Sequence, residues 1–370
     1  MTLDISAAFD TIIHILLLDC LKRIGISGIP LKWFQSYLSK RKIKLKLKNN
    51  FSDIIDLLIG IPQGGVLSPT LYSIYISDII HLLDMLDIHY HLYADDIIIY
   101  FSTKNFKTVQ DLQDKINALM IAIKNFLISK HLKLNSDKTE IMHISHNSRL
   151  NLKFNSIDIL NENIKMKSTI KCIGYIIDHQ LNMKQQISET IKKSNFALHC
   201  VSKIRQFLDI HSTQIIINAL VISKLEYNLE LLYNIKQMDV ERLEKILRKS
   251  IRLIFNLKKK DSVTAYMKKI NWLPIAERIK IKNIKIIHNS LCCQEPQYIR
   301  DLFEMNENPH TRQNNGSNLK IPLALSEFHK KALSIYGPSL YNQIPLDIRK
   351  SNNFNDRLKK YYIKKNFENQ

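Results

Sequence analysis

The chain lacks the cysteine patterns of disulfide-linked and zinc-binding proteins. Its 370 residues include five cysteines, and no two of them form a Cys-x-x-Cys pair. An odd number of cysteines without such pairs argues against a disulfide framework and against a zinc knuckle. We therefore predict a reducing compartment. The cysteines are Cys20, Cys172, Cys200, Cys292 and Cys293.

Long apolar runs are also absent. No window approaches the roughly 18 uncharged apolar residues of a membrane-spanning helix. The first residues lack the basic segment and apolar run of a secretory signal. We predict neither a membrane span nor a signal peptide, and we find no internal repeat. The apolar fraction of 45% and the charged fraction of 24% are those of a globular protein rather than a disordered one.

Positive charge is what the sequence has in excess. Lys and Arg number 54 against 34 Asp and Glu, which gives a net charge of +20. Such a charge favours polyanions as partners, with nucleic acid ahead of an acidic membrane. Taken alone, however, it is equally well explained by solvated helix faces. Short basic clusters occur at 39–48, 257–260 and 357–365.

Hydrophobic periodicity predicts an α+β fold for the first part of the chain and helices for the rest. The order strand, helix, strand, strand, helix, strand describes a small antiparallel sheet backed by helices. Composition changes near residue 181 and again near 260–265. The expected elements are a strand at 1–10, helices at 11–25 and 30–41, an exposed basic strand at 42–48, a loop entering one long helix at 60–86, a hairpin at 89–101, a helix near 106–130, a turn running into a strand at 132–144, a short strand at 171–178 and a polar loop at 306–318.

Two adjacent carboxylates interrupt the apolar hairpin. Asp95 and Asp96 lie between its strands, although Asp is depleted in strands and neighbouring like charges repel. Mg²⁺ binds through one or two carboxylates plus substrate phosphates, and paired ions assist phosphoryl transfer. Asp4, on a strand expected beside the hairpin, is the natural third ligand. Taken by itself, the Asp95–Asp96 pair is equally typical of a solvated turn, and Asp4 taken by itself could be a helix N-cap. The apolar neighbours expected to hold the strands are Leu3, Ile5, Leu92, Tyr93, Ile97 and Ile98.

The order of the motifs is more specific than any one of them. Five motifs together resemble the palm of a reverse transcriptase, in the form that non-LTR, jockey-like retrotransposons have. They are "LDISAAFDTI", "GIPQGGVLSP", "YADD", "LKLNSDKTE" and "IGYIID". "WFQSYLSKRK", "NWLPIAERIKIK" and "YGPSLYNQIPLDIR" are similar to further segments of such elements, so the resemblance covers nearly the whole chain. It implies a right-hand polymerase palm at 1–181, a helical thumb at 182–262 and a C-terminal helical region of unknown role at 263–370.

The resemblance implies an RNA-directed DNA polymerase in which a primer 3′-OH attacks a deoxynucleoside triphosphate. The implied partners are an RNA template, a DNA primer and dNTPs, without a membrane. The implied cofactor is a pair of Mg²⁺ ions, with Mn²⁺ as an alternative, and the implied location is the nucleus, the cytoplasm or both. The implied site residues are Asp4, Asp95 and Asp96 as metal ligands, Phe9 against the ribose 2′-OH, Gln63 and Gly64 beside the nucleotide, and Lys138 assisting the leaving pyrophosphate. Core packing explains Phe9 equally well, and a solvated turn explains Lys138.

The sequence departs from the family pattern in two ways. Ile13 stands where an acid is common, although Asp10 and His14 remain. The fingers region expected before the first motif is largely missing, so we expect an N-terminally truncated fragment whose first strand frays as an edge strand. The alternative function is a catalytically inert remnant that only binds RNA or RNA–DNA duplex. An intron-encoded maturase is a weaker alternative, against which the C-terminal segments argue.

Overall fold

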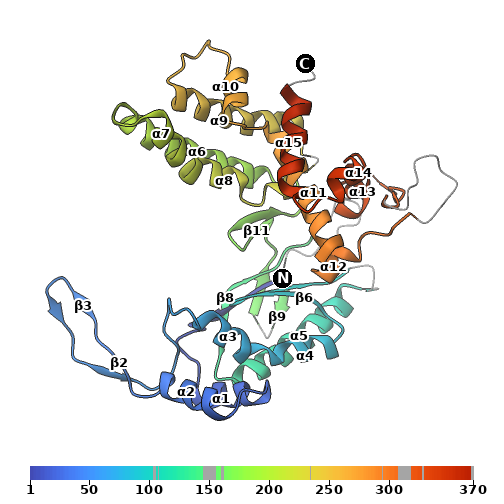
Figure 1. Cartoon of the computed structure of the whole chain (residues 1–370). Coiled ribbons are helices and arrows are strands. Elements are labelled where there is room, and N and C mark those ends of the chain that lie inside the picture. Colours follow the sequence, from blue (N-terminus) through green and yellow to red (C-terminus); the bar gives the residue numbers. More distant parts are fainter. Residues whose placement is uncertain are drawn as a thin grey trace. The chain divides into compact units, whose positions relative to one another are not determined.

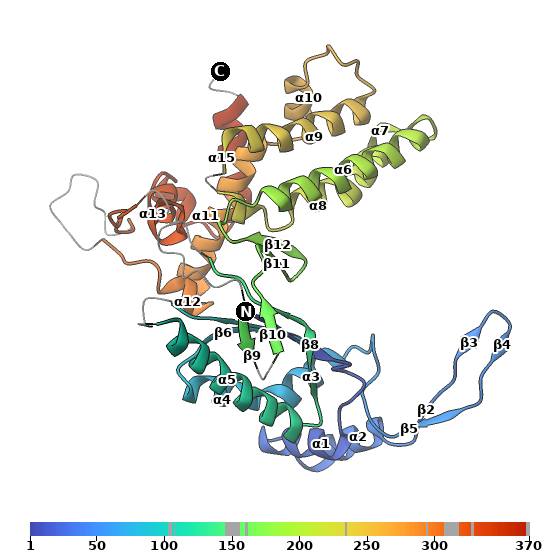
Figure 2. The same ribbon diagram turned by 180° about the vertical axis from the view of Figure 1, so that it is seen from behind.

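The computed structural model describes two compact units, Met1–Gln180 and Leu181–Gln370 (Figures 1 and 2). Both helices and strands are present, so the expectation of a mixed fold is confirmed. The polar loop expected at 306–318 lies outside the described residues except for its two end residues. The described residues are 1–102, 106, 108–144, 156–159, 162–233, 235–293, 295–306, 318–326 and 329–367.

A four-stranded antiparallel sheet forms the centre of the N-terminal unit. Its strand order is β6 (His89–Tyr93), β7 (Asp96–Tyr100), β1 (Thr2–Ser6) and β8 (Lys133–Glu140). Because side chains alternate along a strand, β1 buries Leu3 and Ile5 and directs Asp4 to the opposite face. β7 buries Ile97 and Ile99 in the same way.

β1 is an interior strand, because β7 pairs with one of its sides and β8 with the other. The Met1 amino group donates a hydrogen bond to the carbonyl oxygen of Ile99 at 2.8 Å. Burial lowers the pKa of this amino group to about 6. The expectation of a fraying edge strand is therefore wrong, since both neighbours hold β1.

Helices pack against the buried side of the sheet and share one hydrophobic core with it. The helix α5 begins with a capping box, in which the Thr108 side chain accepts from the backbone of Asp111 and the Asp111 side chain accepts from that of Thr108. The prediction that Tyr93 helps to hold the strands is wrong, because 61% of its surface is exposed just before the hairpin turn. The helices are α1 (His14–Arg23), α2 (Gly28–Leu38), α3 (Ser68–Ile76), α4 (Asp78–Met85) and α5 (Val109–Ser129).

Two expected elements of this unit differ in detail. The long helix predicted within 60–86 is divided at Ser77, whose hydroxyl donates to the carbonyl of Ile74 at 2.8 Å. The short strand predicted at 171–178 is a hairpin of β11 (Thr169–Cys172) and β12 (Tyr175–Asp178). Its turn contains Gly174 at φ +75°. A further hairpin joins β9 (Ser156–Ile159) and β10 (Glu162–Lys165).

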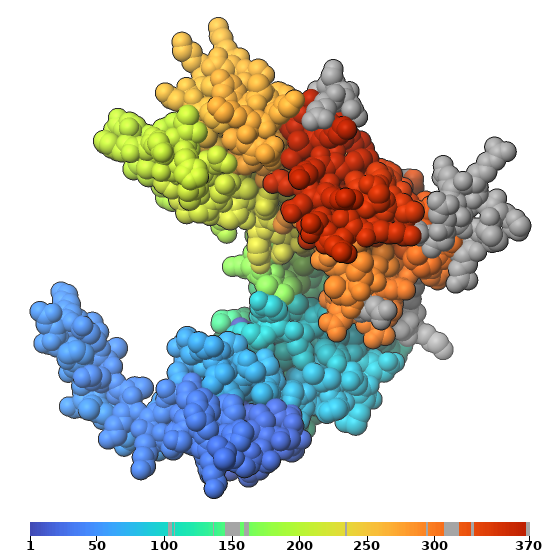
Figure 3. Space-filling model, viewed as in Figure 1, coloured from blue at the N-terminus to red at the C-terminus, as the bar shows by residue number. Residues whose placement is uncertain are grey.

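The exposed basic strand predicted at 42–48 is present as part of a longer ribbon. β2 (Arg41–Ile43) pairs with β5 (Ile55–Leu57), and β3 (Lys46–Leu47) pairs with β4 (Asn50–Phe51). Figure 3 shows this blue ribbon standing away from the rest of the N-terminal unit. The strand is interrupted between β2 and β3, so the predicted continuous strand is divided in two.

The described part of the C-terminal unit is helical. One of its cores lies among α11, α13 and α15 and includes Ile284, Leu340 and Leu358. In the described residues, no helix is long and apolar enough to cross a membrane. The elements are α6 (Lys184–Ile204), η3 (Arg205–Phe207), α7 (Ile210–Ile217), η4 (Asn218–Ile222), α8 (Ser223–Glu226), η5 (Leu229–Leu232), α9 (Gln237–Phe255), α10 (Thr264–Lys269), α11 (Ile275–Cys293), α12 (Gln297–Arg300), η6 (His329–Lys331), α13 (Leu333–Asn342), α14 (Leu346–Arg349) and α15 (Phe354–Phe367).

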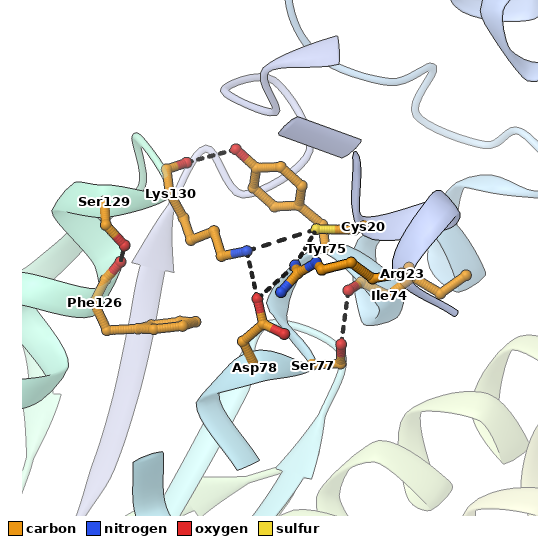
Figure 4. Close-up of polar contacts among 9 residues, drawn as sticks. All are labelled: Cys20, Arg23, Ile74, Tyr75, Ser77, Asp78, Phe126, Ser129 and Lys130. Atoms are coloured by element: carbon orange, nitrogen blue, oxygen red, sulfur yellow. Dashed lines mark hydrogen bonds and ion pairs between the residues drawn. The ribbon is translucent and has the colours of Figure 1, made fainter. Parts of the chain in front are cut away.

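An ion-pair network and a neighbouring hydrogen bond join four helices of the N-terminal unit. The carboxylate of Asp78, at the start of α4, accepts hydrogen bonds from Arg23 and from Lys130, each at 2.7 Å (Figure 4). Burial opposes the ionisation of Asp78, but the hydrogen bonds and the positive charges of Arg23 and Lys130 together outweigh it and lower the pKa of the carboxyl. The Tyr75 hydroxyl donates to the backbone carbonyl of Lys130 at 2.6 Å. These contacts tie α1, α3 and α4 to the end of α5.

We predict that Asp78→Asn lowers the free energy of unfolding by about 2 kcal/mol at pH 7. The substitution leaves Lys130, whose side chain is 12% exposed, without its counter-charge. Because the pKa of Asp78 is lowered by folding, its contribution is present above the unfolded value of about 3.9 and is lost as the pH falls through the folded value. Urea unfolding followed by circular dichroism at several pH values measures both effects.

The matched control is Asp19→Asn. Asp19 pairs with Lys22 on the exposed surface of α1, with both side chains more than half exposed. This variant is expected to lose less than about 0.5 kcal/mol. Equal losses for the two variants would contradict the role assigned to the Asp78 network.

Candidate active site

A cavity of about 550 Å³ in the N-terminal unit brings together residues from distant segments of the chain. Six of the seven predicted site residues line it: Asp4, Phe9, Gln63, Gly64, Asp95 and Lys138. The seventh, Asp96, lines a second cavity of about 240 Å³ that shares Asp4 and Lys138 with the first. The predicted residues therefore lie together, and their chemical roles stay predictions.

Strand register explains the approach of the three carboxylates. Leu3 lies opposite Ile97, so the next step of this antiparallel ladder places Asp4 across from Asp96. Tyr93 pairs with Asp96 at the end of the hairpin, which leaves Asp95 in the turn. The sheet thus supplies one carboxylate from β1, one from β7 and one from the turn.

The carboxylates act on one another electrostatically. Burial and the charges of Asp95 and Asp4 raise the pKa of Asp96. Burial, with the same two charges, also raises the pKa of the Tyr72 hydroxyl. This hydroxyl has no hydrogen-bond partner among the described residues. Negative charge is therefore concentrated where a divalent cation would relieve it.

Asp4 is held by two neighbours from β8. Lys138 Nζ lies 3.3 Å from Asp4 Oδ2, and Asn135 Nδ2 donates to the same oxygen at 3.3 Å. The Lys138 side chain is 66% exposed, so this pair is weak and readily exchanged. Sequence reasoning identified Lys138 but missed Asn135, which only the pairing of β1 with β8 places opposite Asp4.

A β-bulge in β8 positions Lys138. The pairing register with β1 shifts between Thr2↔Glu140 and Asp4↔Asn135, and the Thr139 hydroxyl donates to the Asn135 carbonyl at 3.0 Å across the shift. Bulges re-aim side chains and are common beside active sites. The prediction of a turn at the start of 132–144 is wrong, because the chain is already extended from Lys133.

The donor set suits a hard divalent ion without enclosing one. Carboxylate oxygens are the ligands that Mg²⁺ prefers, and it keeps waters and substrate phosphates as further ligands. Within the described residues, no group of three or more His, Cys, Asp or Glu side chains is arranged to hold a metal ion by itself. In this conformation the Asp4 carboxylate is paired with Lys138 and accepts a hydrogen bond from Asn135. The residues fit a site completed by substrate rather than a closed metal cage.

The loop that carries Gln63 is clamped to the segment after β1. Gln63 Nε2 donates to both carboxylate oxygens of Asp10 at 3.0 Å. The backbone N–H of Gly60 donates to the Ile12 carbonyl at 2.7 Å, and His14 Nε2 lies 2.7 Å from the Gly60 carbonyl oxygen. Sequence reasoning noted Asp10 and His14 without a role, because their partners lie about fifty residues away.

Phe9 both packs against the core and lines the larger cavity. Its ring stacks on buried Tyr72 with the ring centroids 5.1 Å apart. The same residue lines the larger cavity. Packing against the core therefore holds Phe9 at the wall of the cavity.

The family model described as reverse transcriptase (RNA-dependent DNA polymerase) matches residues 1–177, which contain every predicted site residue. Residues 1–177 belong to the reverse transcriptase family. The chain is 26% identical, over 192 residues, to the RNA-directed DNA polymerase from mobile element jockey of Drosophila melanogaster, and the match covers 50% of this chain and 20% of that protein. The expected kinship with jockey-like elements is confirmed.

Two other known proteins also match this chain. A probable RNA-directed DNA polymerase from transposon BS of Drosophila melanogaster is 30% identical over 146 residues, 37% of this chain and 15% of that protein. The chain thus spans less than a quarter of the length of these relatives. A solved structure of telomerase from Candida albicans, in complex with the TWJ fragment of telomeric RNA, matches with a TM-score of 0.31 and 13% identity over 81% of this chain and 50% of that one.

We predict that Gly60→Ala disrupts the clamped loop. Gly60 has φ +84°, and a Cβ there would lie 2.8 Å from the backbone carbonyl oxygen of Asp10. Strain and backbone overlap together should lower the free energy of unfolding by about 3 kcal/mol. Gly64→Ala is the control, because Gly64 has φ +79° with nothing within 4 Å of its added Cβ, and it should cost only about 1 kcal/mol. Equal costs in urea unfolding would contradict the close approach at Gly60.

Proposed function

We propose that this chain is the polymerase part of a non-LTR, jockey-like retrotransposon. It transfers nucleotides from dNTPs to the 3′-OH of a DNA primer on an RNA template, in the nucleus or the cytoplasm. The supporting observation is that Asp4, Asp95 and Gln63 line one cavity of a reverse transcriptase domain, with Asp96 on a cavity that shares Asp4. In this proposal residues 1–181 are the palm, 182–262 the thumb and 263–370 a C-terminal region.

Asp4, Asp95 and Asp96 would hold two Mg²⁺ ions, with Mn²⁺ as the alternative. When bound, such ions stabilise the attacking and leaving oxygens of an in-line displacement. The sheet contributes rigidity, because Leu3, Ile5 and Ile97 anchor the strands in the core on the far side from Asp4 and Asp96. Misplacing such a group by about an ångström can cost a hundredfold in rate.

The remaining residues orient the nucleotide and the leaving group. Gln63, held by Asp10, and Gly64 would lie beside the incoming nucleotide, where the absence of a side chain at Gly64 allows close approach. Phe9 would narrow the cavity against a ribose 2′-OH. Lys138 would leave Asp4 to donate a proton to the departing pyrophosphate, a transfer that general acids assist.

An inert remnant that only binds nucleic acid is the second candidate function. It is favoured by one observation, that no metal-binding group of three side chains is already arranged among the described residues. The two candidates differ in whether bound template and primer are extended. Binding and extension therefore have to be measured on the same samples.

Asp95→Ala should lower primer extension at least about 100-fold while leaving duplex affinity within about twofold. The reason is that Asp95 lies in the hairpin turn and supports no strand pairing of its own. Extension of a DNA primer on an RNA template with dNTPs and Mg²⁺ is measured beside duplex binding. Asp114→Ala, which removes an exposed carboxylate on α5, is the control and should extend normally. Equal extension by Asp95→Ala would contradict the assignment, and binding without extension by the wild type would favour the inert remnant.

Phe9→Val should raise the use of ribonucleotides relative to deoxynucleotides about 10- to 100-fold. Removing the ring opens the cavity wall while Tyr72 stays in place. Single-nucleotide incorporation with paired rNTP and dNTP substrates gives the ratio. Phe34→Val, which removes a half-buried ring from α2, controls for lost packing and should leave the ratio unchanged. An unchanged ratio in Phe9→Val would limit Phe9 to a packing role.

A further inference from the structure

The C-terminal unit contains a basic cavity outside the part of the chain that matches the reverse transcriptase family. The cavity measures about 390 Å³ and lies among η4, α8, the turn at 271–273, α11 and α15. Figure 2 shows α8, α11 and α15 within this unit. Among the described residues, four cations line the cavity against a single carboxylate. These are Arg278, Lys282, Lys285 and Lys359 against Glu226.

Two of the four cations are held by protein oxygens. Arg278 donates to the Glu226 carboxylate and, at 2.8 Å, to the carbonyl of Leu273. Lys282 donates to the backbone carbonyl of Glu226 and lies 3.6 Å from the Glu230 carboxylate. The one carboxylate of the cavity is therefore already neutralised, and the guanidinium that neutralises it is fixed in place.

The other two cations are available to a ligand. Lys285 of α11 and Lys359 of α15 have neither a hydrogen bond nor an ion pair with any residue that the structure describes. The side chains of Asn218 and Asn271 also line the cavity and make no hydrogen bond within the described part of the chain. Ammonium and amide groups are the donors that bind phosphate oxygens. Packing of α15 against α11 thus brings the unpaired Lys285 and Lys359 to one cavity.

The volume and the aromatic packing indicate the kind of ligand. A cavity of this size holds more than one small ion, since ligand pockets begin at about 300 Å³. Trp272 is buried, and its ring lies 5.3 Å beneath the Arg278 guanidinium. The ring is therefore covered and offers no exposed face on which a base could stack. What the cavity presents is positive charge and hydrogen-bond donors, which contact phosphate and sugar without reading sequence.

We propose that this cavity binds the phosphate backbone of a nucleic-acid strand, independently of base sequence and outside the polymerase site. The proposal rests on the proposed function only for the identity of the strand, which we take to be RNA. It gives the C-terminal region a role in holding template. Lys285 and Lys359 supply the decisive contacts, and Arg278 and Lys282 keep the surrounding potential positive.

The test compares K285Q/K359Q with the wild type in binding to single-stranded RNA of mixed sequence. Fluorescence anisotropy is recorded over a range of salt concentrations without metal ions or dNTPs. The double variant should bind about tenfold more weakly near physiological salt. If each lysine neutralises one phosphate, the negative slope of log affinity against log salt concentration should become shallower by about 1.4. K268Q/K360Q removes the same charge from exposed positions outside the cavity and should change neither quantity.

Lysine acetylation with mass spectrometry locates the contact. RNA should protect Lys285 and Lys359, but not Lys268 or Lys360, from acetylation. Inorganic pyrophosphate is the comparison ligand. If pyrophosphate protects Lys285 and Lys359 but K285Q/K359Q binds RNA as tightly as the wild type, the ligand is not a nucleic-acid strand. Equal effects of the two double variants would overturn the cavity as a specific site.

These outcomes are independent of catalysis. An unchanged RNA affinity in K285Q/K359Q, with normal extension by the wild type, overturns this proposal and leaves the proposed function intact. Loss of RNA binding in K285Q/K359Q, with no extension by the wild type, supports the binding cavity and contradicts the proposed polymerase function.

Discussion

The pairing of β1 with strands on both of its sides is the constraint on which the candidate site depends. On one side, β7 brings the Asp96 carboxylate across from Asp4. On the other, the bulged strand β8 brings Lys138 and Asn135 to the same carboxylate. Because the buried alternation of β1 is anchored in the core, a slip of one residue would turn Asp4 into that core and would dismantle the site.

The local elements and most of the site could be predicted from the sequence. The strand-like runs on either side of Asp95 and Asp96 predicted the 89–101 hairpin, and the order of the motifs predicted that Asp4 and Gln63 would meet Asp95 in one place. The pairing of β1 with the hairpin was expected, but its interior position between β7 and β8 could not be predicted, because interior and edge strands share one local pattern. The bulge that positions Lys138 and the bonds from Gln63 to Asp10 arise from long-range pairing. Local propensity carries no information about contacts of that kind.

Charge has opposite signs at the two proposed sites. In the N-terminal unit three carboxylates act on one another, and burial adds to the cost of ionising Asp96. In the C-terminal unit the described residues collect cations around one neutralised carboxylate. Carboxylates attract the metal ions that carry out phosphoryl transfer, whereas lysines contact phosphates directly. The overall charge of +20 suits a long polyanionic partner.

The most direct test of the account is a titration with Mn²⁺ followed by electron paramagnetic resonance, which reads metal binding without requiring catalysis. The account predicts that the wild-type chain binds Mn²⁺ and that Asp4→Asn weakens this binding at least about tenfold, since the carboxylates of β7 and the hairpin turn alone would hold the ion poorly. Asp114→Asn, on the exposed surface of α5, should bind Mn²⁺ like the wild type. Identical Mn²⁺ affinity and stoichiometry in the wild type and Asp4→Asn would contradict the claim that β1 completes a metal site.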